Sequence, residues 1–235
     1  DQAVIITDSV LVPDTSAALT NRYGAYSANR INFLVGYRRI DFLRVYGFDA
    51  VQAPQDVRRG LQVAAVLGRG IKLQQDDEKD YFVSTALYYG LGNETSFAAV
   101  EMLGERRRNL QLNQWDGVLA SGRVAWYYKQ FPSQTLVTSL EFGGGWRQRI
   151  PFQLTLADKQ GGVAGYGKSE LGGGKRVVFR MEDRILSGRV RELISTSLAG
   201  FVESGKLWAQ DAPFGVNTGM QTSIGVGVLA AFPPN

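Results

Sequence analysis

The chain has 235 residues, a net charge of +4 and a pI of about 9.3, a size that fits one large β domain or a barrel. It contains neither cysteine nor histidine, which excludes disulfides, thiolate metal sites, cysteine nucleophiles and every Ser-His-Asp arrangement. The basic residues are scattered, and their densest run, 106–108, is only three residues long, so no nucleic-acid-binding stripe is expected. We therefore expect no enzymatic activity, no cofactor and no metal site.

Glycine is unusually common, with 28 residues, and many of these lie within strand-like runs. In a barrel wall, glycine permits bends and the close approach of a plug or a neighbouring side chain. The chain has no run of 18 apolar residues, so no transmembrane helix is expected. It begins at Asp1 without the basic and apolar regions of a signal peptide, which an outer-membrane protein would carry, so we expect a processed form or a fragment.

The first half of the chain alternates apolar and polar residues in short runs. We expect a strand over 2–12 and a polar loop over 14–28. Alternation then predicts strands over 31–37 and 40–48, separated by a turn at Arg38-Arg39. Turn signals at Ala53-Pro54 and Asp56 follow, and alternation resumes over 60–69.

The central part begins with a strongly polar loop over 72–80, followed by an alternating segment over 81–89. Residues 94–105 fit either a short helix or a strand, and a strand is preferred because the segment lies between two alternating ones. Further strands are expected over 118–129 and 136–146, with a shorter one over 151–156. In the 136–146 strand, Leu140 and Phe142 are expected to point outward, and Ser139 and Glu141 inward.

The last part, 161–235, is a glycine-rich loop followed by three alternating segments. In the first of these, apolar and charged side chains fall on opposite faces: Val177, Phe179 and Met181 on one, and Arg176, Arg180, Glu182 and Arg184 on the other. A soluble sheet also alternates, but here the pattern recurs along nearly the whole chain, in about twelve strands of roughly 9–12 residues. The sequence therefore predicts an all-β, transmembrane antiparallel β-barrel, apolar outside and wet inside, in a single domain 1–235.

Residues 161–208 resemble the C-terminal barrel region of the BamA/TamA-type outer-membrane assembly factors, a superfamily that includes the transporters of two-partner secretion. Val163-Ala164-Gly165-Tyr166 stands where the family has its V/I-R-G-F/Y loop motif. The two following strands are similar to Phe179-Arg180-Met181-Glu182-Asp183-Arg184 and to Phe201-Val202-Glu203-Ser204-Gly205-Lys206-Leu207-Trp208. The tail with Ser223, Gly225, Gly227 and Pro233 resembles the next strand.

The resemblance implies that the loop near 157–174 folds back into the barrel lumen. In the family, the motif arginine is held by acidic residues on the two succeeding strands, which correspond to Glu182 and Glu203. Here the arginine is replaced by Ala164. We therefore predict that another cation reaches the two carboxylates: Lys168 or Arg180, with Arg184 on the wall as a further candidate. The alternative is that Glu182 and Glu203 are solvated wall residues.

The family barrel closes with about sixteen strands and usually follows periplasmic POTRA domains, of which this sequence has no counterpart. The resemblance thus implies an incomplete barrel domain in the bacterial outer membrane, acting non-covalently in insertion or transport of polypeptides. Its implied partners are outer-membrane lipid and client or complex-partner proteins. Two alternatives stay open. One is a non-transporting scaffold or anchor in an envelope complex, including the anchor of a fused patatin-like lipase. The other is a soluble β protein, such as a lipocalin-like or sandwich module.

Overall fold

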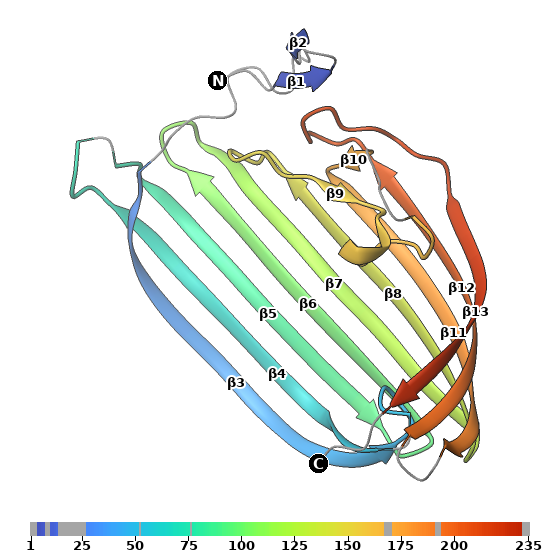
Figure 1. Cartoon of the computed structure of the whole chain (residues 1–235). Coiled ribbons are helices and arrows are strands. Elements are labelled where there is room, and N and C mark those ends of the chain that lie inside the picture. The colour runs from blue at the N-terminus through green and yellow to red at the C-terminus, as the bar shows by residue number, and fades with distance from the viewer. Residues whose placement is uncertain are drawn as a thin grey trace.

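The computed structural model describes residues 4–7, 10–13, 27–51, 53–75, 77–166, 171–190 and 194–231. Its main element is one antiparallel sheet of nine strands, in the order β13-β12-β11-β8-β7-β6-β5-β4-β3 (Figure 1). The strands are β3 (Asn29–Tyr46), β4 (Pro54–Ile71), β5 (Asp80–Gly92), β6 (Ser96–Asn109), β7 (Gln114–Phe131), β8 (Gln134–Trp146), β11 (Lys175–Val190), β12 (Ile194–Trp208) and β13 (Gln221–Ala231). Two small pairs accompany the sheet, β1 (Val4–Thr7) with β2 (Val10–Pro13) and β9 (Leu154–Thr155) with β10 (Gly172–Gly173), together with a 3₁₀ turn η1 (Asp158–Gln160).

The all-β, antiparallel prediction is confirmed, and the ambiguous segment 94–105 lies in strand β6. Two details differ from the sequence prediction. The expected turn at Arg38-Arg39 lies inside β3, because neither residue is a turn former and both pair in register with β4. The segment 2–12 contributes the short strands β1 and β2 instead of one long strand. The described part of the chain thus has nine strands in its main sheet where about twelve were expected.

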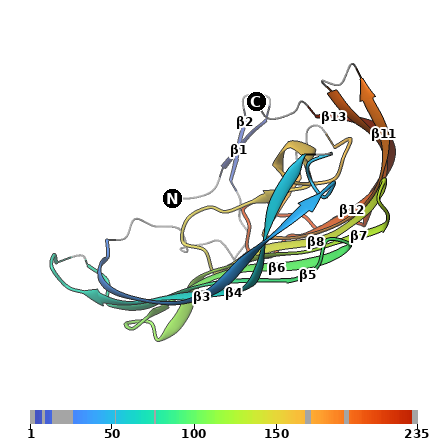
Figure 2. The same cartoon turned by 90° about the horizontal axis from the view of Figure 1, so that it is seen from below.

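The sheet curves into a trough with two accessible faces (Figure 2). The concave side, here called the inner face, carries the charged side chains of Glu101, Arg123 and Glu141, which oppose one another in register. The convex side, the outer face, carries large apolar side chains that remain exposed, such as Leu140 at 44% and Val226 at 89%. The predicted faces of β11 are confirmed, since Phe179 and Met181 are exposed on the outer face while Arg180 points inward to Glu141.

The two ends of the trough differ in their connections. The long-loop end carries the loops 72–79, 147–174 and 209–220, whereas the short-turn end carries the tight turns 93–95 and 132–133. The 147–174 connection, which joins β8 to β11, lies on the concave side of the sheet (Figure 2). It is here called the inner loop, and only its described residues, 147–166 and 171–174, are discussed.

At the short-turn end, the β3–β4 hairpin leaves the sheet and folds over the inner face. Residues 54–59 of β4 pair with β3 alone, and pairing with β5 begins at Gly60, whose φ of +116° permits the bend. We call residues 43–57 the hairpin tip. Its Val45 and Phe48 are fully buried against Phe97 and Tyr127, and the rings of Phe48 and Tyr127 stack at 4.9 Å.

Hydrogen bonds tie the hairpin tip to strands far across the sheet. Lys129 Nζ donates to the Tyr46 carbonyl at 2.9 Å, and Thr135 Oγ1 donates to the Gly47 carbonyl at 2.8 Å. Arg184 on β11 donates to the Phe48 carbonyl. The tip therefore closes part of the trough from one end, while the inner loop covers it from the other.

We predict that Phe48→Ala lowers the free energy of unfolding by about 3–5 kcal/mol, because it removes a fully buried ring and leaves a cavity. The measurement is denaturant unfolding followed by tryptophan fluorescence. Phe42→Ala is the matched control on the same hairpin, where the ring is 61% exposed and the change should be within about 0.5 kcal/mol. Equal effects of the two variants would contradict the buried hairpin tip.

Candidate functional site

A row of alternating charges crosses the inner face. It consists of six residues on six strands, here called the inner charge row: Arg58, Glu101, Arg123, Glu141, Arg180 and Glu203. Three neighbouring pairs face each other directly in the strand register: Glu101 with Arg123, Arg123 with Glu141, and Arg180 with Glu203. Opposite charges on directly facing residues stabilise an antiparallel pair by about 0.2–1 kcal/mol.

The contacts along the row are short. Arg58 Nη2 lies 3.1 Å from Glu101 Oε1, and Arg123 Nε lies 3.5 Å from Glu141 Oε1. Arg180 joins the last two acids, because its Nη1 donates to Glu141 Oε1 at 2.7 Å and its Nε lies 3.3 Å from Glu203 Oε1. Neither carboxylate at Arg180 is therefore an isolated negative charge.

The inner loop packs its apolar residues on this part of the wall. Leu156 and Val163 are buried against Val178 of β11 and Leu207 of β12. Gly205 makes this approach possible, because a Cβ at that position would lie 2.7 Å from Val163 Cγ2 and 2.8 Å from a Leu156 methyl. The glycine in the segment 201–208 thus has a packing role, which is to admit the loop.

Wall side chains bond the loop backbone directly. Arg180 Nη2 donates to the carbonyls of Gly161 and Gly162, each at 2.7 Å. In return, the backbone N–H of Ala164 donates to Glu203 Oε2 at 2.6 Å. Charge-assisted hydrogen bonds of this kind contribute about 1.5–3 kcal/mol each. Arg180 therefore bridges two wall carboxylates and two loop carbonyls.

Two further contacts extend this attachment. Arg176 Nη1 donates to the carbonyls of Thr155 and Gln160 at 2.8 and 2.9 Å. The Tyr166 hydroxyl donates to Gln221 Oε1 of β13 at 2.5 Å. Between Ala164 and Tyr166, Gly165 has a φ of +84°, a conformation that favours glycine at the third position of the predicted motif.

The structure brings together part of the predicted cluster. Val163, Ala164, Gly165, Tyr166, Arg180 and Glu203 meet on the inner face, and Arg180 occupies the position proposed for a substitute cation. Lys168 lies outside the described residues. Glu182 and Arg184 lie nearer the short-turn end and pair with each other at 2.8 Å. Of the two predicted acids, Glu182 and Glu203, only Glu203 is hydrogen-bonded to the described part of the loop motif, at Ala164. The side chain of Glu182 accepts a hydrogen bond from Arg184 instead.

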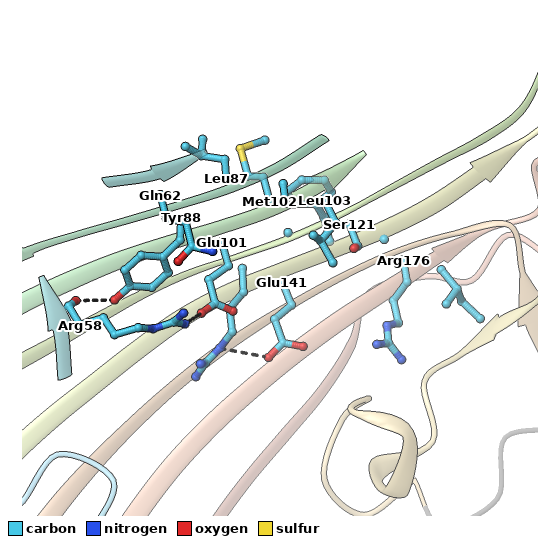
Figure 3. A pocket seen from close by; sticks show the side chains of 16 residues that line it. Arg58, Gln62, Leu87, Tyr88, Glu101, Met102, Leu103, Ser121, Glu141 and Arg176 are labelled. Atoms are coloured by element: carbon cyan, nitrogen blue, oxygen red, sulfur yellow. Dashed lines mark hydrogen bonds and ion pairs between the residues drawn. The ribbon is translucent and has the colours of Figure 1, made fainter. Parts of the chain in front are cut away.

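The charge row borders a cavity of about 520 Å³ (Figure 3). Tyr88, Glu101 and Glu141 line one side, and Leu154 of the loop and Arg176 line the other. The Tyr88 hydroxyl donates to the Arg58 carbonyl at 2.5 Å, and the Arg58 guanidinium lies 4.1 Å from the centre of the Tyr88 ring. Sequence reasoning placed Glu141 and Arg176 on the inward face but did not find Arg58, Glu101 or Arg123, because cross-strand pairing depends on a register that alternation alone does not give.

A second charge cluster holds the inner loop at the long-loop end. Arg149, near the start of the loop, lies 2.5 Å from Glu78, while Arg30 and Arg107 surround the fully buried Asp80. Beside this cluster, Asp77 accepts hydrogen bonds from the side chains of Ser27 and Asn29 and from two backbone N–H groups. These four donors favour the carboxylate and lower the pKa of Asp77.

Comparisons with family models, with curated proteins and with solved structures find no match. In the part of the chain that the structure describes, no helix is long and apolar enough to cross a membrane. Nor do three or more Asp or Glu side chains among those residues converge as a metal site would require.

We predict that Arg180→Met detaches the inner loop, because it leaves the Gly161 and Gly162 carbonyls and Glu203 without their cation. Lys159, exposed on η1, provides the readout: trypsin cleavage after it should accelerate about tenfold, as expected for a loss of about 1.4 kcal/mol. Arg123→Met is the matched control, since it also removes a cation from Glu141 but has no described bond to the loop. Equal acceleration in both variants would contradict a specific role of Arg180.

We predict that Asp77→Asn lowers the thermal midpoint most at neutral pH. A carboxylate with a lowered folded-state pKa stabilises the fold above its unfolded pKa of about 3.9, and that stability is lost as the pH falls towards the folded-state value. The difference between wild type and variant should therefore be constant above about pH 5 and shrink below about pH 4. Asp158→Asn, which removes an exposed carboxylate, is the control. A difference that grows towards acid pH would contradict the assignment.

Proposed function

We propose that the chain forms the wall of a β-barrel in the bacterial outer membrane, and that it acts non-covalently in the insertion or transport of polypeptides. The observation that carries the proposal is the separation of charge between two accessible faces. Along β7, the outward residues from 118 to 128 are all uncharged: Val118, Ala120, Gly122, Val124, Trp126 and Tyr128. The inward residues of the same strand include Asp116 and Arg123, which pair with other charges.

The uncharged stretch has the height that a bilayer requires. Ten residue steps separate Val118 from Tyr128, which is about 33 Å of strand, or about 25 Å across a membrane at a tilt of about 40°. The outward residues of β8 and β13 are uncharged over similar heights. In water such a surface would be an aggregation liability, whereas in hydrocarbon it is stable.

The edges of the sheet support a function based on strand pairing. All neighbours are antiparallel and the sheet has nine strands, so β3 and β13 run in the same direction. These two edges cannot close on each other by antiparallel pairing, because that closure requires an even total number of strands. Outer-face residues of β13 are highly exposed, Ile224 at 80% and Val226 at 89%. An edge of this kind pairs readily with an incoming strand.

The inner-loop attachment supports the same class of protein. The resemblance at 163–166 and 201–208 implies a loop held against the wall by an acid, and the Ala164–Glu203 bond and the bridge through Arg180 fit that arrangement. Polypeptide insertion by a seam and a held loop needs no covalent chemistry, which agrees with a chain that lacks cysteine and histidine.

A second candidate function is a non-transporting scaffold or anchor in an envelope complex, including the anchor of a fused patatin-like lipase. The observation that favours it is the coverage of the inner face from both ends, by the inner loop and by the hairpin tip. A barrel filled in this way anchors a partner without moving a substrate.

The absence of native cysteine permits a direct test of the membrane proposal. In the full chain reconstituted into vesicles, a fluorophore on Val124→Cys, an outer-face position, should be quenched by nitroxides on lipid chains. The same fluorophore on Ser121→Cys, an inner-face position of the same strand, should be quenched by aqueous iodide. The reverse assignment, or equal access of iodide to both positions, would overturn it.

Insertion activity is tested with the same vesicles. We expect them to accelerate the integration of an unfolded outer-membrane barrel protein several-fold over empty vesicles, and we expect Arg180→Met to reduce that effect. Correct membrane topology without any acceleration would overturn the insertion proposal and favour the anchor.

A further inference from the structure

Cations lie over aromatic rings on the outer face at the long-loop end. The Arg69 guanidinium is 4.2 Å from the centre of the Tyr81 ring, and that of Arg106 is 4.4 Å from a ring of Trp115. On the same face, towards the β13 edge of the sheet, Lys175 Nζ lies 4.7 Å from a Trp146 ring, and Lys206 Nζ lies 5.2 Å from a Trp208 ring. The uncharged part of the outer face begins directly beyond these pairs.

The last two pairs form one continuous surface across β8, β11 and β12. We call Trp146, Lys175, Lys206 and Trp208 the outer lysine patch. Lys175 and Trp208 face each other directly in register, while Lys206 faces Val177, two residues further along β11. The two lysines are thus diagonal neighbours, with Cα atoms about 7–8 Å apart, and an indole flanks each of them.

The charges of this patch are not neutralised by the part of the protein that the structure describes. No carboxylate among those residues forms a salt bridge with Lys175 or Lys206, although most inner-face arginines have one. Their outward neighbours Gly144, Val177 and Ser204 are uncharged. Since a cation over an aromatic face keeps its charge, the patch offers two unpaired ammonium groups to a ligand.

We propose that the outer lysine patch binds the phosphate headgroup of an anionic lipid. The inference rests on the proposed membrane location. The two ammonium groups complement a phosphate, and the indoles suit the depth at which headgroups meet acyl chains. Beside the lysines, Val177, Phe179 and Met181 continue down β11 as an apolar track for the acyl chains of the same lipid.

The test uses the full chain in vesicles of equal parts phosphatidylcholine and phosphatidylglycerol, extracted with mild detergent. The lipids that co-purify are quantified. We expect the ratio of phosphatidylglycerol to phosphatidylcholine in the retained lipid to exceed that of the bulk vesicle, and the double variant Lys175→Gln/Lys206→Gln to lower that ratio towards the bulk value, by about fivefold per lysine and up to about 25-fold. The matched control is Lys72→Gln/Lys79→Gln, which removes the same charge from a loop at the same end, away from the rings, and should keep the enrichment.

Four outcomes would overturn the inference. Equal recovery of the two lipids by the wild type removes the lipid preference. If the enrichment survives in Lys175→Gln/Lys206→Gln, the patch is not the binding site. If it falls equally in Lys72→Gln/Lys79→Gln, the preference depends on net charge and not on the patch. A chain that stays in the aqueous phase and retains neither lipid overturns the membrane proposal as well, and the fluorophore experiment then fails with it. Unchanged circular dichroism of the double variant shows that its loss of lipid is not a loss of fold.

Discussion

The two-residue period of the strands is the constraint on which the rest of this structure depends. It sends the charges of Glu101, Arg123 and Glu141 to the concave face and leaves Val124 and Leu140 on the convex one. Because the sheet curves, charges that would be dispersed on a flat surface meet across neighbouring strands. Arg58, Arg123 and Arg180 each have a carboxylate within reach, and no α-helix covers either face of the described sheet.

Arg180 connects the wall of the sheet to the inner loop. Its guanidinium is planar and has five donors in a fixed fork, so it can serve carboxylates on β8 and β12 and carbonyls of the loop at once. A lysine at the loop itself has three donors at one point and would not span the same groups. With alanine at position 164, the cation is supplied by the wall, and the loop contributes only its backbone N–H to Glu203.

Sequence reasoning reached the all-β character of the chain and the faces of β11 because alternation is local: Arg180 and Phe179 differ by one position and therefore by face. It reached Val163 and Glu203 through the resemblance alone. It did not find the partnership of Glu141 with Arg180, which are 39 positions apart and meet only through the register of β8 and β11. It did not find that Val45 and Phe48 form a buried core, since the bend at Gly60 that brings them over the inner face leaves the alternating pattern unchanged.

The inner loop and the hairpin tip together decide how much of the trough can be open. Both are held largely by bonds from wall side chains to backbone carbonyls: Arg180 to Gly161 and Gly162, and Thr135 and Lys129 to the hairpin tip. Such bonds fix a segment without requiring a particular side chain on it, and each can be exchanged for water at modest net cost. The apolar contacts of Val163 and Phe48 are different, because they cannot be replaced by water. Opening either end therefore requires both the exchange of these polar bonds and the withdrawal of two buried apolar side chains, Leu156 and Val163 of the inner loop or Val45 and Phe48 of the hairpin tip.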